Sequence, residues 1–154
     1  MSHPYTINAE RGYLRLGTTR LSYLDWGGAG PPAVLLHGIT SSAAAFWQVG
    51  PALRAAGFRP IALDMPGHGE SDLSPDHAID TVAGLVGGVI EQLGLEAVRL
   101  IGHSWGGATA LALAGGAHPA RAALARVALV DPALAMAATW GAPRLPDRSE
   151  ERRV

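Results

Sequence analysis

Five consecutive residues, Gly102-His103-Ser104-Trp105-Gly106, have the types and the spacing that could make a serine a nucleophile. They fit the pattern G-x-S-x-G, in which the serine lies on a tight turn between a strand and a helix. Small flanking residues let the strand and the helix approach closely, and the helix N-terminus favours a negative charge that develops near the hydroxyl. The chemistry predicted for Ser104 is therefore nucleophilic attack by its exposed hydroxyl.

Two elements must position this turn. The apolar run from Ala97 to Ile101 predicts a buried strand, and the small residues 105–117 predict the helix that follows. The other predicted elements are a hairpin of strands 12–16 and 20–25, strands 33–36, 58–63 and 125–130, and helices 43–56 and 80–93. The alternation of strand and helix predicts an α/β fold: a mostly parallel sheet with helices on both faces.

The predicted helix ends carry capping residues. Ser41 or Ser42 is expected to be the N-cap of helix 43–56, and Gly57 its C-cap. Gly94 is expected to end helix 80–93. The three boundaries divide the middle of the chain into short strand–helix units.

Composition limits the chemistry and the partners. The 154 residues contain no cysteine and no lysine, so disulfides, thiolate chemistry and a Ser–Lys dyad are excluded, and the base for Ser104 must be a histidine or a carboxylate. The net charge of −1 offers no basic face to nucleic acid. Met1 to Arg11 lacks the apolar stretch of a signal peptide, and turn formers interrupt the uncharged segment 26–53. We therefore expect a cytoplasmic chain with no membrane contact.

Two further motifs follow predicted strands. His37-Gly38 comes after strand 33–36, and Asp64-Met65-Pro66-Gly67-His68-Gly69-Glu70-Ser71 comes after strand 58–63. With Gly102-His103-Ser104-Trp105-Gly106-Gly107 in third place, the chain resembles the N-terminal half of an α/β-hydrolase over about residues 12 to 132. The sequence Ser104-Trp105-Gly106 is similar to that of proline iminopeptidases, esterases and C–C bond hydrolases, so it does not identify a substrate. We expect residues 1–132 to be the N-terminal part of the hydrolase core and 133–154 the start of a lid or linker, or a disordered tail.

The resemblance implies roles for individual residues. Ser104 would attack a carbonyl carbon to form a covalent acyl-enzyme. The backbone N–H groups of Trp105 and Ile39 would hold the oxyanion, and losing one such donor typically costs about 2.7–4 kcal/mol of transition-state stabilisation. Asp131 is a candidate for the orienting acid, because some family members take it from this strand end; otherwise it caps a turn with Pro132. His68 is expected to order its loop. Structural roles are expected for His37, Gly38, Asp64, Gly67, Gly69, Gly102, His103 and Gly106.

The general base is the missing part. In the family the triad runs in the order serine, acid, histidine. The last histidine of this chain is His118, at the end of the predicted helix after the turn and just before Pro119, where it cannot reach Ser104. The triad is therefore expected to be incomplete within these residues.

Three interpretations follow. The chain is the N-terminal portion of a serine hydrolase of the esterase, lipase or peptidase kind, or a catalytically inactive binding module, or active only when another chain donates the histidine. In each case the expected ligand is a small molecule. No cofactor is expected, and no metal, because the closely spaced His68, Glu70, Asp72 and His77 lie in a loop that the family explains. The apolar strand 126–130 is expected to form a sheet edge, which offers a place for self-association or for a partner segment.

Overall fold

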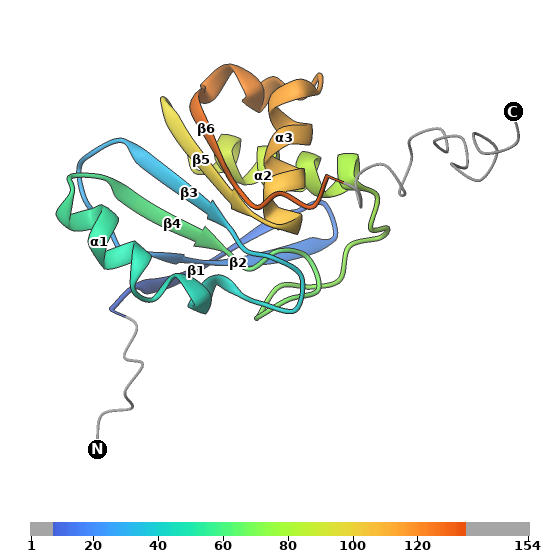
Figure 1. The fold of residues 1–154 in the computed structure, drawn as a ribbon. Coiled ribbons are helices and arrows are strands. Elements are labelled where there is room, and N and C mark those ends of the chain that lie inside the picture. The colour runs from blue at the N-terminus through green and yellow to red at the C-terminus, as the bar shows by residue number, and fades with distance from the viewer. Residues whose placement is uncertain (1–7, 135–154) are drawn as a thin grey trace, which may run out of the picture.

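The computed structural model describes residues 8–134, which form one six-stranded sheet with helices on both faces (Figure 1). The strand order is β1-β2-β4-β3-β5-β6. The strands are β1 (Glu10–Leu16), β2 (Thr19–Asp25), β3 (Pro32–Leu36), β4 (Arg59–Leu63), β5 (Val98–His103) and β6 (Leu124–Val130). The helices are η1 (Ala43–Phe46), α1 (Val49–Ala55), α2 (Ile79–Gln92), α3 (Trp105–Gly115) and η2 (Pro119–Ala123), where η marks a 3₁₀-helix.

The direction of the strands confirms the predicted α/β class. β4, β3, β5 and β6 run parallel, and the helices connect them. β1 and β2 form the predicted antiparallel hairpin, and β2 lies antiparallel to β4. Because the four parallel strands share one direction, the loops after β3, β4, β5 and β6 all leave the sheet at the same edge.

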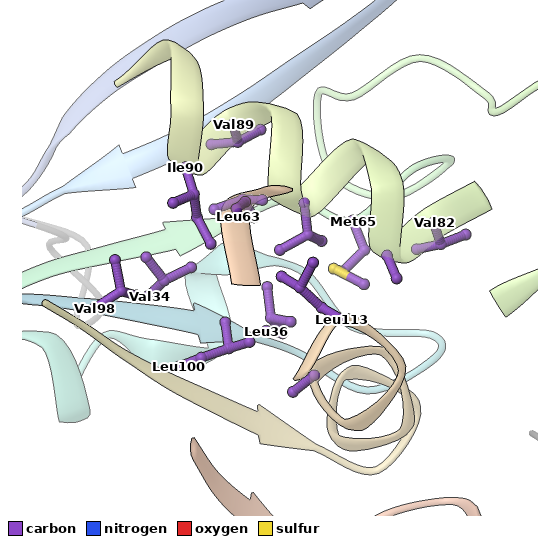
Figure 2. Packing of buried hydrophobic residues seen from close by; sticks show 14 of the residues in the cluster. Val34, Leu36, Leu63, Met65, Val82, Val89, Ile90, Val98, Leu100 and Leu113 are labelled. Carbon is purple, nitrogen blue, oxygen red and sulfur yellow. The ribbon is translucent and has the colours of Figure 1, made fainter. Parts of the chain in front are cut away.

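The core has two layers, one on each face of the sheet. Val34 and Leu36 of β3 face α2 and α3, whereas Leu35 between them faces the layer that contains η1 and α1. Figure 2 shows Val82, Val89 and Ile90 of α2 against the strands, with Leu113 of α3 beside them. This packing holds α3, and with it the turn at Ser104, firmly against the sheet.

The prediction of a single helix over residues 43–56 is wrong, because the structure divides this segment into two helices. The structure has η1 over Ala43–Phe46 and then α1 over Val49–Ala55, and the Ser42 side chain makes no capping hydrogen bond. The physical reason is Pro51, which lacks an N–H and would clash with the preceding turn in the middle of a long helix but is tolerated in a first turn. Gly57 follows the end of α1 with a φ of 91°, as its predicted capping role requires.

β6 is the edge strand that the sequence predicts. It pairs only with β5 among the described strands. Val127 and Leu129 are each 38% exposed, and Val130 is 52% exposed. Within this part of the chain no helix is long and apolar enough to cross a membrane. Of the predicted lid, linker or tail segment 133–154, residues 135–154 lie outside the described residues.

Candidate active site

Ser104 occupies the turn between β5 and α3, as the sequence predicts, and its backbone is strained. Its φ is 52° and its ψ is −116°, a conformation that costs a non-glycine residue about 1–3 kcal/mol. The Ser104 N–H donates to the Val130 carbonyl at 3.0 Å, and its carbonyl accepts from the N–H groups of Ala108 at 3.1 Å and Ala133 at 3.0 Å. The turn is therefore held from α3 and from the end of β6, which keeps the half-buried Ser104 at the sheet edge.

The glycines of the motif are required by close backbone contacts. A Cβ at Gly106 would lie 2.7 Å from the His37 carbonyl oxygen, and one at Gly102 would lie 2.6 Å from the Gly107 nitrogen. A Cβ at Gly38 would lie 3.2 Å from the Ser104 Cβ. The loop after β3, the end of β5 and the start of α3 thus meet without room for side chains.

Two backbone N–H groups are available at this edge. The Trp105 N–H belongs to the first turn of α3, where N–H groups have no acceptor inside the helix. The Ile39 N–H lies in the loop after β3. Neither group donates a hydrogen bond to another residue of the range 8–134. Both N–H groups are therefore free to donate a hydrogen bond to an oxyanion.

Asp64 ties the loop after β4 to its surroundings. Its buried carboxylate accepts from Ser22 Oγ at 2.6 Å, Ala43 N–H at 2.7 Å, Arg11 Nη1 at 2.8 Å and Glu70 N–H at 3.2 Å. Burial by itself would raise the pKa of this carboxyl, but these hydrogen bonds lower the pKa below its ordinary value. The sequence pattern does not single out Arg11 or Ser22 as Asp64 partners, because nothing in it shows that the hairpin lies against β4.

Gly67 and Gly69 allow this loop to turn tightly around the carboxylate. Both have positive φ, 77° and 53°. A Cβ at Gly69 would overlap the Asp64 carboxylate itself. The loop therefore wraps around Asp64, whose carboxylate accepts the Glu70 N–H of the same loop.

His37 links the loops after β3 and β4. Its Nε2 accepts from the Met65 N–H at 2.9 Å, and its Nδ1 donates to the Gly38 carbonyl at 2.7 Å. The ring is only 1% exposed, and burial lowers the pKa of His37 from its ordinary value, with a smaller effect of the same sign from His68. His37 is therefore a neutral, structural histidine and is not placed to act as a base.

Acid is expected to destabilise the fold through His37. Because its folded-state pKa is lowered, the unfolded chain binds more protons between that pKa and about pH 6.5, so the free energy of unfolding falls as the pH falls through this window. Urea unfolding between about pH 7.5 and about pH 5 should show a loss of at most about 1.4 kcal/mol per pH unit from this group. The variant His37→Gln should lose that contribution, and an unchanged pH slope in the variant would contradict the assignment.

The other candidate residues do not complete a triad within the described residues. Ser104 Oγ hydrogen-bonds to no histidine or carboxylate of this part of the chain. His103 is exposed on the strand end, and Asp131 is exposed after β6 with a φ of 44° and no side-chain hydrogen bond to residues 8–134. Asp131 does follow β6 at the same end of the sheet at which Ser104 follows β5, as the sequence predicts.

The predicted position of His118 at the end of the helix after the turn is wrong. α3 ends at Gly115, and His118 is the N-cap of η2, where its Nδ1 accepts from the Ala120 N–H at 3.1 Å. Gly115-Gly116 ends the helix early, because glycine is a poor helix former. His118 still cannot act as the base, because Ser104 precedes α3 and His118 follows it. At about 1.5 Å per residue, the two ends of this helix are about 16 Å apart.

A small apolar hollow lies next to the turn. Its volume is about 310 Å³, and Phe46, Val49, Ile101, His103 and Val130 are among its lining residues, although Ser104 is not. A larger, open hollow of about 840 Å³ is lined by Trp26 and Arg54 at the opposite edge of the sheet, away from Ser104. No group of three metal-ligating side chains occurs among the residues that the structure covers.

The sheet is mixed, and Ser104 lies on a strained turn between the parallel strand β5 and the N-terminus of α3. This is the arrangement of the α/β-hydrolase fold. The family model of the alpha/beta hydrolase fold matches residues 31–148, and the chain belongs to this family. The fold resemblance that the sequence predicts is thereby confirmed.

Individual relatives agree with the family. The chain is 38% identical over 97 residues to the sn-1-specific diacylglycerol lipase ABHD11 of Mus musculus, and 36% identical over 91 residues to bifunctional epoxide hydrolase 2 of Sus scrofa. These matches cover 61% and 57% of this chain but only 32% and 16% of the relatives. A solved esterase from Exiguobacterium antarcticum has a TM-score of 0.68 and 31% identity, over 75% of this chain and 42% of the esterase. The chain thus spans a third or less of the two curated relatives.

Proposed function

We propose that Ser104 is the nucleophile of a hydrolase that acts on small carbonyl substrates such as esters and amides. The observation that carries this proposal is the backbone of Ser104, strained at a φ of 52° and held at the N-terminus of α3 with the free N–H of Trp105 directly after it. A strained residue persists only where its surroundings hold it, and such residues cluster at functional sites. Relatives named as a lipase and as an epoxide hydrolase support the hydrolase class.

The nucleophile type favours a carbonyl over an epoxide substrate. A serine oxygen that attacks a carbonyl leaves an ester on Ser104, which water then cleaves to regenerate the hydroxyl. A serine oxygen that opens an epoxide would instead leave an ether, which water does not cleave under these conditions. Two free backbone N–H donors also suit the oxyanion of a tetrahedral intermediate. The likeness to an epoxide hydrolase therefore supports the fold more than that substrate.

We infer that the general base comes from polypeptide other than residues 8–134, with Asp131 as the candidate acid. None of the described histidines bonds to Ser104. The free edge of β6 offers unpaired backbone groups to which a further strand, from the same polypeptide or from a second chain, could add. The remaining alternative is a binding module without catalysis, and the labelling of Ser104 separates the two.

Ser104 is expected to react with a fluorophosphonate probe when a base is supplied. Imidazole added to the purified chain can replace the missing histidine, so the labelling rate should rise with imidazole concentration, and mass spectrometry should find the adduct on Ser104. The variant Ser104→Ala and the denatured wild-type chain should remain unlabelled. A rate that rises with protein concentration, in the absence of imidazole, would indicate a histidine donated by a second copy. No labelling at any imidazole concentration would overturn the proposed nucleophile.

A further inference from the structure

Two histidines join the loops after β3 and β4 in a reciprocal way. His37, in the first loop, accepts the Met65 N–H of the second loop at 2.9 Å. His68, in the second loop, accepts the Thr40 N–H of the first loop through Nε2 at 3.3 Å. Each ring also donates through Nδ1 to a carbonyl of its own loop, at 2.7 Å to Gly38 for His37 and at 3.0 Å to Pro66 for His68.

This hydrogen-bond pattern assigns one tautomer to both rings. A ring that donates through Nδ1 and accepts through Nε2 is the neutral Nδ1–H imidazole, because an imidazolium has two donors and no acceptor. The two ring centroids lie 5.1 Å apart at an angle of 61°. The His68 ring also lies 5.4 Å from the Trp105 ring. His68 therefore sits between the loop that carries Ile39 and the residue that follows Ser104.

The two rings hold consecutive peptide planes on either side of Ile39. His37 fixes the Gly38 carbonyl, and since a trans peptide is planar, this directs the Ile39 N–H of the same plane to the opposite side. His68 fixes the Thr40 N–H, which belongs to the next plane. Thr40 needs this support, because its φ of 64° is unfavourable for a β-branched residue.

We propose that His68 is a positioning residue for oxyanion stabilisation: through Nε2 it holds the Ile39–Thr40 peptide, and thereby keeps the Ile39 N–H directed at the oxyanion. The proposal rests on the proposed function of Ser104. It gives His68 a more specific part than loop ordering, since only a side chain with an acceptor at this place can hold the Thr40 N–H. The acceptor is lost when the ring carries its proton on Nε2.

The first test uses the wild-type chain and needs no activity. Long-range ¹⁵N spectra of the labelled protein identify which ring nitrogen of His68 carries the proton. The expected result is the Nδ1–H tautomer, with a Thr40 amide that exchanges slowly with solvent. An Nε2–H tautomer at His68 would overturn the proposal, whether or not Ser104 is a nucleophile.

The second test compares two substitutions. His68→Leu keeps the bulk of the ring without an acceptor, whereas His68→Gln places a carbonyl oxygen near the position of Nε2. With imidazole present, Ser104 of His68→Leu should react with a fluorophosphonate about 10- to 100-fold more slowly, less than the loss of a whole oxyanion donor. His68→Gln should react within about threefold of wild type, since it restores the acceptor for one neutral hydrogen bond.

A matched control and the opposing outcomes complete the comparison. His77 is an exposed histidine later in the same connection between β4 and α2, and His77→Leu should leave both the labelling rate and the Thr40 exchange unchanged. Equal labelling rates in His68→Leu and wild type, or equal losses in the Leu and Gln variants, would overturn the positioning role. A wild-type chain that shows the Nδ1–H tautomer but no labelling would instead overturn the proposed nucleophile and leave the contact structural.

Discussion

Gly106→Ala is expected to destabilise the chain by about 3 kcal/mol or more, the upper range for overpacked sites. The added Cβ would lie 2.6 Å from the Leu36 carbonyl carbon and 2.7 Å from the His37 carbonyl oxygen. Both contacts are with backbone, so no side chain can rotate away, and α3 must separate from β3. Urea unfolding followed by circular dichroism measures the free energy directly. The same shift of α3 would move the Trp105 N–H, so labelling of Ser104 should fall as well.

Gly115→Ala is the matched control in the same helix. No heavy atom lies within 4 Å of a Cβ built at Gly115, at the other end of α3. Alanine is a better helix former than glycine, so this variant should be neutral or more stable by at most about 1 kcal/mol. Equal losses of stability in the two variants would show that the effect of Gly106→Ala does not come from the close approach of α3 and β3. Unchanged stability in Gly106→Ala would contradict the close approach of α3 and β3.

The turn at Ser104 could be predicted from sequence because its constraints are local. An apolar strand, two glycines and a run of small residues leave few conformations for the serine between them. The three motifs after β3, β4 and β5 meet for an equally simple reason, since parallel strands deliver their loops to one edge. The edge position of β6 followed from the same order of elements.

Long-range contacts with no local signature could not be predicted. The Asp64 carboxylate binds Arg11 and Ser22, which are 53 and 42 residues away in sequence, and neither residue has a motif. The contact of His68 with Thr40 depends in the same way on how two loops lie against each other. The break between η1 and α1 is different, because Pro51 indicates it within the sequence and the break was therefore predictable.

Asp64→Ala is expected to destabilise the chain by about 2–5 kcal/mol, because each buried donor that is left without an acceptor costs about 1–3 kcal/mol. The substitution leaves the buried hydroxyl of Ser22 and the buried N–H of Ala43 without an acceptor. Arg11 contributes less, because its side chain is 28% exposed and can be hydrated. Asp72→Ala, in the same loop but with a side chain that is 44% exposed, should cost at most about 1 kcal/mol.

Acid should reproduce the Asp64→Ala effect in the wild-type chain. Because the folded-state pKa of Asp64 lies below its ordinary value of 3.8, the carboxylate stabilises the fold above that value, and this contribution is lost as the pH falls through the lowered folded-state pKa. Wild type should therefore lose stability more steeply than Asp64→Ala as the pH falls below about 4 in urea unfolding. Parallel curves would show that the hydrogen bonds to Asp64 do not favour its ionised form. Since the loop around Asp64 also carries His68, the variant should further speed exchange of the Thr40 amide, which links the stability of this loop to the geometry of the proposed site.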